Sequence, residues 1–449
     1  MSTRKELRAL VLLSTPVVIT QVGQMLLGVV DTMMVGWLGV TDLAAAALGH
    51  VWVMGTLIGA MGIVFGIDPL VSQAHGEGND EKFTRGLRDG MVIAMLTSIP
   101  VAVLWLYTEE ILVLLGQAPH LARMAREYVI VQIPGIPAFL LFTALRQGLQ
   151  ARGIVAPAMW IMLVANGINA LLNQALIFGK MGFPALGLQG AGLATTGTRY
   201  FLLIALIGWI LAFRLLPRPQ GSPGWIHPRG LLTVLGYGLP VSIQLSLELW
   251  AFQVATLLAG KLGEVQLASH TIVLNMASLS FMVPLGIAIG AVTRVGNLIG
   301  ARNPEGARRA AWVALGLGGA VMLGSATVFV VFRDRLPRFY TDSAPALGLA
   351  ASILPVAAAF QIFDGVQVVG GGILRGMGRT LPAAVFNLVG YYLLALPLAY
   401  VLGLHTGLGL RGIWWGLVLG LFAVSLMLVL WIARRGPGTA VCPSRHSRP

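Results

Sequence analysis

Apolar residues fill most of this chain in runs of about 20 to 30, separated by short clusters of Gly, Pro and Arg. A helix of about 20 apolar residues crosses the hydrocarbon core of a bilayer, which is about 30 Å thick. Helix is the expected form because lipid offers no hydrogen-bond partner to an open backbone. The pattern therefore predicts twelve transmembrane helices, at residues 9–38, 43–74, 88–108, 121–144, 156–180, 187–213, 230–260, 265–294, 308–332, 345–373, 380–403 and 410–433.

Composition agrees with this pattern and gives the fold class as an all-α integral membrane protein. Of the 449 residues, 57% are hydrophobic and 10% are charged, whereas a soluble domain carries about 25% charged residues. The first apolar run is too long for a cleavable signal peptide and lacks a small-residue cleavage site. We expect this run to stay in the protein as the first span.

The positions of the Lys and Arg residues predict the orientation of the chain. With the amino terminus inside, 21 of the 30 lie in cytoplasmic segments, 8 lie in outer segments and Arg199 lies within a span. Cytoplasmic loops of membrane proteins carry the excess of basic residues, so we expect both termini to be cytoplasmic. The net charge of +13 is then a topology signal, and we expect no nucleic acid partner.

The sequence repeats itself after 224 residues. This shift aligns Pro16 with Pro240 and "VGWLGVTDLA" (35–44) with "AGKLGEVQLA" (259–268). Each repeat holds six spans, an even number, so the two halves share one orientation about an axis along the membrane normal. Such parallel repeats are typical of transporters, although a duplication kept only for packing is an alternative. Further matched pairs are Gly36/Gly260, Gly39/Gly263, Leu43/Leu267, Gly62/Gly286, Gly66/Gly290, Gly76/Gly300 and Asn79/Asn303, followed one register later by Gly153/Gly378 and Pro157/Pro382.

The repeat predicts an amino-terminal six-helix lobe over 1–213, a cytoplasmic linker over 214–229, a carboxy-terminal six-helix lobe over 230–433 and a disordered cytoplasmic tail over 434–449. The only cysteine, Cys442, lies in this tail, which excludes an intramolecular disulfide and a thiolate metal site. Matched glycines within the spans are typical of closely packed membrane helices. Prolines within the spans predict either bends on which the two halves flex or static kinks.

Four ionisable residues lie inside the predicted spans: Asp31, Arg199, Glu248 and Asp364. Charged side chains at such depths are costly and usually face the bundle interior or water. These four residues are therefore candidates for functional sites.

Asp31 has polar neighbours at a matching depth in the first half of the chain. Asp31 and Asn173 each lie about seven residues from the outer end of their spans, and Thr195 lies about eight from its own. Asn166, Asn169 and Asn173 share one helical face by their spacing. We expect Asp31, Asn169, Asn173 and Thr195 to converge. Their oxygens suit a hard cation or a proton site; permanent bonding to Asn, or pairing with Arg199, is the structural alternative.

The second half places its acids differently. The repeat partner of Asp31 is Ala255, and Glu248 falls opposite Gln24. Straight helices would separate the depths of Glu248 and Asp364 by roughly 9 Å, so either the span boundaries are inexact or Pro355 bends its helix.

Enzyme chemistry is not indicated by the sequence. No nucleophile has a base nearby, and no nucleotide motif could power transport. "GGGILRGMGR" at 370–379 lacks the Gly-Lys-Ser/Thr of a phosphate loop. The scattered residues His50, His75 and His270 are interpreted as core or loop histidines. We therefore expect neither an enzyme nor a cofactor.

Several stretches, taken in order, resemble one known family. "VVDTMMVGWLGVTDLAAAALG" (29–49), "PLVSQAHGEGN" (69–79), "NGINALLNQALIFG" (166–179) and "GAGLAT" (190–195) resemble the multidrug and toxic compound extrusion (MATE) family, in its NorM-like bacterial branch. With the two six-span halves, the similarity covers nearly the whole chain.

This resemblance implies an antiporter of a bacterial cytoplasmic (inner) membrane. It would export amphipathic, often cationic compounds by alternating access while Na⁺ or H⁺ moves down its gradient, as a monomer in the lipid bilayer without an ATPase subunit. The family's cation- and substrate-binding residues carry over onto Asp31, Asn169, Asn173 and Thr195 in the amino-terminal lobe, and onto Glu248 and Asp364 in the carboxy-terminal lobe. Na⁺ would bind at Asp31, Asn169 and Asn173, or at Glu248 and Asp364.

One position departs from the family pattern. Some Na⁺-coupled relatives have a Tyr four residues before the last acid, where this chain has Phe360. The coupling ion therefore stays open between Na⁺ and H⁺.

Three other functions are alternatives to the antiporter. A lipid-linked oligosaccharide flippase of the same superfamily would have a broader cationic cavity, and the acids Asp31, Glu248 and Asp364 argue against it. A membrane-embedded enzyme would need a catalytic constellation. A structural scaffold would lose only stability when Asp31 is changed.

Overall fold

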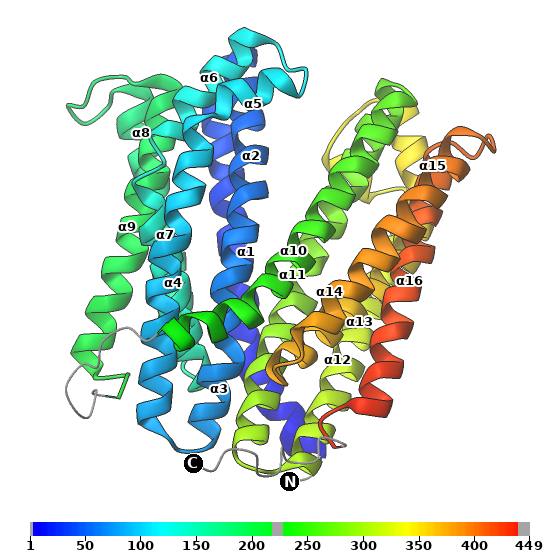
Figure 1. Ribbon diagram of the computed structural model, residues 1–449. Helices are drawn as coiled ribbons and strands as arrows, with labels where there is room; N and C mark the ends of the chain where they lie inside the picture. Colours follow the sequence, from blue (N-terminus) through cyan, green and yellow to red (C-terminus); the bar gives the residue numbers. More distant parts are fainter. Residues whose placement is uncertain (1–2, 218–227, 439–449) are drawn as a thin grey trace. The chain divides into compact units, whose positions relative to one another are not determined.

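The computed structural model describes residues 3–217 and 228–438, and within them it contains helices and no strand. Eleven helical segments are long and apolar enough to cross a membrane, two of which (Val40–Gly76 and Thr380–Leu404) join consecutive elements; a twelfth is added if one bent pair forms a single span. The predicted all-α membrane fold is therefore confirmed (Figure 1). The helices are α1 (Thr3–Gly36), α2 (Val40–Val64), η1 (Phe65–Ile67), α3 (Asp68–Gly76), α4 (Asp80–Leu106), α5 (Thr108–Leu114), α6 (Pro119–Ile130), α7 (Gly135–Ala151), α8 (Ala156–Phe178), α9 (Gly187–Phe213), α10 (Pro228–Lys261), α11 (Glu264–Gly300), α12 (Pro304–Val331), η2 (Leu336–Phe339), α13 (Ala344–Gly376), α14 (Thr380–Asn387), η3 (Leu388–Ala395), α15 (Leu396–Leu404) and α16 (Leu410–Arg435).

Three predicted spans are irregular helices. The span expected at 121–144 consists of α6 and α7, which are bent by 56° at a break that ends at Pro134; proline cannot donate the helical hydrogen bond at such a point. The second span passes from α2 to α3 through the short 3₁₀ turn η1. The eleventh contains η3, a π-helical segment, a feature that is frequent at functional sites.

The described residues form two compact units whose boundaries differ from the predicted lobes. One unit holds residues 3–18, 72–78 and 247–438, and the other holds 19–71, 79–217 and 228–246. The first half of α1 thus belongs with the carboxy-terminal helices, and the first half of α10 belongs with the amino-terminal ones. Sequence spans could not reveal this exchange, because each of the two helices is continuous across the boundary. Parts of the predicted linker (218–227) and tail (439–449) lie outside the described residues.

In the carboxy-terminal unit, the first half of α1 packs tightly on α11. Arg294 donates two hydrogen bonds to Glu6, from Nε at 2.8 Å and from Nη2 at 2.9 Å. Gly286 meets the backbone of α1 so closely that a β-carbon there would lie 3.0 Å from the amide nitrogen of Val18. A buried two-point ion pair and a glycine contact therefore fix this half of α1 to the unit.

The amino-terminal unit repeats this packing with the first half of α10. A β-carbon at Gly62 of α2 would overlap the backbone of Ser242. Residues 62 and 242 are the counterparts of 286 and 18 under the 224-residue shift, so the two contacts are equivalent. The repeat is thus preserved in the packing, and the matched glycines act as close-approach points.

Loop geometry preserves the repeat as well. Asn79 caps α4 by accepting a hydrogen bond from the backbone of Lys82, and its counterpart Asn303 caps α12 in the same way from Gly306, each at 2.8 Å. Just before these caps, Gly78 has a left-handed φ of 69°, and its counterpart Arg302 has a φ of 54°. Arg302 therefore adopts a backbone conformation that suits glycine better.

Each unit has its own apolar core. The carboxy-terminal core lies among α11, α13 and α16, and includes Val273, Ile353, Leu354, Trp414 and Leu417. The core of the amino-terminal unit lies among α7, α8 and α9, and includes Phe142, Leu149, Met162, Leu202 and Leu206. Each acid site described below lies within a single unit.

Candidate functional site

The first candidate site lies in the amino-terminal unit and is centred on Asp31 of α1. Asn173 of α8 donates a hydrogen bond to Oδ1 of Asp31 at 2.6 Å, and Thr195 of α9 donates to Oδ2 at 2.9 Å. Asn169 lies one turn before Asn173 and accepts from its amide at 3.3 Å. The predicted convergence of these four residues on three helices is confirmed.

Hydrogen bonding explains how a carboxylate is accommodated here. Asp31 is only 9% exposed, and Asn169 and Asn173 are buried. Each carboxylate oxygen accepts one hydrogen bond from a neighbouring helix, which offsets part of the cost of removing the charge from water. The side-chain carbonyl of Asn173 has no hydrogen-bond partner among the described residues, so one oxygen remains for a ligand beside the acid.

Two polar residues near this cluster, Asn166 and Arg199, turn away from it. Asn166 donates to the backbone carbonyls of Gly23 and Met162. The guanidinium of Arg199 lies over the rings of Trp105 and Phe139, 5.9 and 5.5 Å from their centroids. Arg199 interacts with Asp31 electrostatically without a hydrogen-bonded ion pair among the described residues.

His50 was interpreted from the sequence as a core or loop residue, yet it lies beside this site. Its ring packs on Gly28, one turn before Asp31, with Cε1 3.3 Å from where a β-carbon of Gly28 would stand. It also interacts electrostatically with Asp31. Residue spacing could not identify this proximity, because the two residues lie on different helices.

The second candidate site lies in the carboxy-terminal unit and is centred on Glu248 of α10. Its Oε2 accepts hydrogen bonds from the amides of Gln367 at 3.0 Å and Asn387 at 3.4 Å. These two amides are also linked to each other at 3.4 Å. Asp364 lies one turn before Gln367 on α13 and interacts electrostatically with Glu248.

The two acids therefore lie close enough to interact electrostatically, although their distances from the helix ends differ. The helices α10 and α13 have 34 and 33 residues, which corresponds to about 50 Å each and exceeds the thickness of the hydrocarbon core. Counting residues from an end does not measure depth in such long helices. The observed ends lie within three residues of the predicted ones, so inexact boundaries do not explain the 9 Å discrepancy.

This second cluster contains buried oxygens that are left without donors. The atoms Oδ1 of Asp364, Oε1 of Gln367, Oε1 of Gln361 and the hydroxyl of Tyr391 have no hydrogen-bond partner among the described residues. All four side chains are at most 4% exposed. Buried polar atoms are normally satisfied by protein, water or an ion, and two neighbouring carboxylates in a low-dielectric site favour a proton or a cation between them. This arrangement is suited to binding a cation.

Aromatic residues line the same cluster one turn further along. Tyr391 stacks edge-on against Phe252, which also contacts Phe360. Phe360 in turn packs against Trp414. Phe360 is therefore part of an apolar wall. Some relatives have a Tyr at this position, whereas in this chain the phenol hydroxyl of the cluster belongs to Tyr391 on the π-helical segment.

Sequence reasoning missed Gln361, Gln367, Asn387 and Tyr391. Matching depth identified neutral neighbours for Asp31 only, and these four neutral residues lie around Glu248. Gln361 and Gln367 lie three residues to either side of Asp364, a spacing that places all three on one helical face. That spacing could have identified them.

Comparison with known proteins gives the same family over most of the chain. A family model described as MatE matches residues 16–174 and 240–401. The chain is 38% identical over 434 residues to a probable multidrug resistance protein NorM from Bradyrhizobium diazoefficiens, covering 94% of this chain and 93% of that protein. It is 32% identical over 450 residues to the multidrug resistance protein NorM of Vibrio cholerae, covering 96% and 97%.

Solved structures share the fold. The crystal structure of the eukaryotic MATE transporter AtDTX14 superposes with a TM-score of 0.90 at 24% identity, covering 97% of each chain. A crystal structure of MATE in complex with MaD3S gives a TM-score of 0.87 at 22% identity, again over 97% of each chain.

Proposed function

This chain belongs to the MATE family, in its NorM-like branch, and on that premise we propose that it is a multidrug efflux antiporter. It exports amphipathic, often cationic compounds and takes up Na⁺ or H⁺ in exchange. As a member of this family the chain is a transporter and not an enzyme, in agreement with the expectation from sequence.

The observation that carries this proposal is the pair of buried acid clusters, one within each unit. In the Asp31 cluster both carboxylate oxygens already accept hydrogen bonds. In the Glu248 cluster a second acid, Asp364, and several oxygens lack donors. A cation satisfies the second arrangement better, because it offers positive charge to oxygens that have no hydrogen-bond partner among the described residues. Glu248 and Asp364 are therefore our preferred site for the coupling ion.

Asp31 with Asn169, Asn173 and Thr195 forms the second part of the proposal. An anionic side chain with an open amide oxygen beside it attracts either an amphipathic cation or the coupling ion. Competition between the two for Asp31 would link export to uptake directly. Cation binding drives transport only if it changes the balance between inward- and outward-facing states, which is the alternating-access step of the proposal.

For a neutral compound, the membrane potential alone is sufficient for useful export. One elementary charge that crosses the membrane yields about 2.3 kcal/mol per 100 mV. Each inward cation can therefore sustain a concentration ratio of about fiftyfold for a neutral compound at that potential. We further propose that the protein works in the bacterial cytoplasmic (inner) membrane as a monomer, with both termini cytoplasmic and without an ATPase subunit.

Ethidium efflux from proteoliposomes tests the function. Na⁺ and pH gradients are imposed separately on vesicles that contain wild type, Asp31→Asn or Glu248→Gln. We expect one of the two gradients to drive efflux in wild type, and each acid variant to lose at least tenfold in rate. Asp334→Asn is a matched control, because Asp334 is an exposed acid and should transport normally.

Two results would count against the proposal in different ways. If neither gradient drives efflux in wild type, the antiporter assignment is wrong. If wild type responds but both acid variants transport normally, the function stands and the site assignment is wrong.

A further inference from the structure

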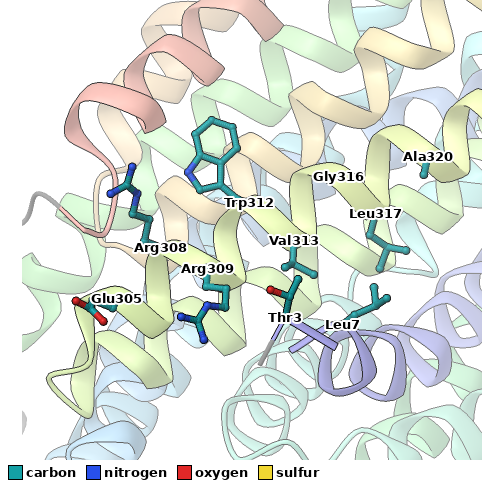
Figure 2. A pocket seen from close by; sticks show the side chains of 10 residues that line it. All are labelled: Thr3, Leu7, Glu305, Arg308, Arg309, Trp312, Val313, Gly316, Leu317 and Ala320. Atoms are coloured by element: carbon teal, nitrogen blue, oxygen red, sulfur yellow. The ribbon is translucent and has the colours of Figure 1, made fainter. Parts of the chain in front are cut away.

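A groove of about 860 Å³ lies on the carboxy-terminal unit, between the start of α1 and one face of α12 (Figure 2). It is remote in sequence from both acid clusters and has no part in the proposed transport chemistry. Its lining residues are Thr3, Leu7, Glu305, Arg308, Arg309, Trp312, Val313, Gly316, Leu317 and Ala320.

The α12 side of the groove changes from charged to apolar along its length. Arg308 and Arg309 lie in the first two turns of the helix, and Trp312 follows one turn later. Beyond it the lining consists of small and aliphatic side chains. The lining positions recur every three or four residues, so they form one continuous face of the helix.

Both arginines are available to a ligand. Arg308 is exposed and Arg309 is half-buried, and within residues 3–217 and 228–438 neither forms an ion pair or a hydrogen bond with another side chain. Glu305 is the one acid of the lining, so the polar end keeps a net positive charge. Figure 2 shows Arg308 and Arg309 on the same helical turn at the polar end of the groove, with their guanidinium groups pointing away from each other.

We propose that this groove binds one anionic phospholipid, with its phosphate at the basic end formed by Arg308 and Arg309 and one acyl chain along the α12 face. Twelve residues separate Arg308 from Ala320, which corresponds to about 18 Å of helix. Half of the hydrocarbon core is about 15 Å, so the groove has the length of one lipid leaflet. Basic pockets between membrane helices are known to hold anionic headgroups, and Trp is the side chain favoured at the membrane interface.

Gly316 supports an acyl chain as the occupant. A β-carbon built at this position meets nothing within 4 Å, so the glycine is not required by packing inside the protein. It leaves the groove open at the point where the lining becomes apolar. A free phosphate ion would use the arginines but not this apolar half.

The lipid would join two helices of the same unit. One wall of the groove is the first turn of α1, through Thr3 and Leu7. The neighbouring residue Glu6 holds the same turn to α11 through Arg294. A bound lipid would therefore add a second attachment for the start of α1.

Native mass spectrometry of the detergent-purified full chain tests this site with dioleoyl phosphatidylglycerol and, separately, dioleoyl phosphatidylcholine. We expect wild type to bind the first phosphatidylglycerol more tightly than phosphatidylcholine. Arg308→Gln combined with Arg309→Gln should weaken phosphatidylglycerol binding by roughly thirtyfold, from about fivefold per basic side chain at a membrane surface. Arg434→Gln with Arg435→Gln is the matched control, because it removes an exposed basic pair at the end of α16.

A second pair of variants tests the apolar half without changing charge. Gly316→Leu fills the groove, whereas Gly324→Leu adds the same side chain to the same helix at another position where a β-carbon meets nothing. We expect only Gly316→Leu to weaken phosphatidylglycerol binding. The proposal is overturned if the two arginine pairs lose affinity equally, if the two leucine variants behave alike, or if millimolar inorganic phosphate displaces the lipid.

Discussion

The buried ion pair between Glu6 and Arg294 gives a sharp test of how burial sets the strength of an interaction. The Glu6 side chain is 1% exposed and that of Arg294 is 20% exposed. Two charge-assisted hydrogen bonds join them, and each such bond contributes about 1.5–3 kcal/mol. Removal of one partner from a buried pair costs about 3–5 kcal/mol. Because water reaches part of Arg294, we expect Glu6→Gln to lower the free energy of unfolding by about 2–4 kcal/mol.

The matched control is Glu81→Gln. Glu81 and Arg85 form a shorter contact, 2.6 Å, but their side chains are 67% and 56% exposed. Exposed pairs one helical turn apart contribute about 0.3–0.5 kcal/mol. If distance decided the energy, Glu81→Gln would cost more than Glu6→Gln; if burial decides it, the order is reversed.

Both variants can be measured by SDS titration in mixed micelles, with tryptophan fluorescence reporting on unfolding. Arg294→Lys adds a third point, because an ammonium group cannot make the same two-point contact; we expect a loss of about 1–2 kcal/mol. Equal losses for Glu6→Gln and Glu81→Gln would refute the reasoning.

Three further outcomes follow from the structure. Arg302→Gly should raise the free energy of unfolding by about 0.5 kcal/mol. The substitution relieves left-handed strain of about 1–2 kcal/mol and adds a backbone-entropy cost of about 0.5–1 kcal/mol. Gly78→Ala, at the repeat-related position, should lower the free energy of unfolding in the same SDS titration. Gly286→Leu should destabilise the protein by more than about 2 kcal/mol, because the new side chain meets the backbone of α1. An unchanged midpoint of thermal unfolding would contradict this contact. Tyr391→Phe should raise the coupling-ion concentration needed for half-maximal transport several-fold and leave ethidium affinity unchanged. The reason is that the Tyr391 hydroxyl is a buried oxygen beside Glu248. Equal losses of ion affinity and ethidium affinity would indicate a general structural role.

Much of the fold could be read from the sequence because the membrane imposes a simple rule. Long apolar runs must be helical, and the 224-residue repeat fixes how the runs are grouped. The exchange of helix halves could not be read in this way. It depends on which neighbour each half of α1 and α10 contacts, and no local signal marks residues 18 or 246 as a boundary.

The Asp31 site was predictable for a different reason. An acid, two amides and a hydroxyl stand out against apolar helices, and equal depth was enough to bring them together. Asn166 shows the limit of that argument, because its amide is taken by the carbonyl of Gly23. The neighbours of Glu248 were missed because depth counts fail in helices of about 50 Å, so Gln367 and Asn387 could not be matched to it as Asn173 was matched to Asp31.

The exchanged helix halves have a consequence for how such a chain can be assembled. The glycine face of α2 is covered by the first half of α10, which comes from the other repeat, and the face of α11 by the first half of α1. A single six-helix repeat with this packing could cover that face only by borrowing a first helix from another copy, as in a domain-swapped homodimer. Fusion of two copies into one chain keeps the swap but removes its dependence on protein concentration. It also means that the amino-terminal unit cannot be completed until residues 228–246, in the second half of the chain, have been synthesised and inserted.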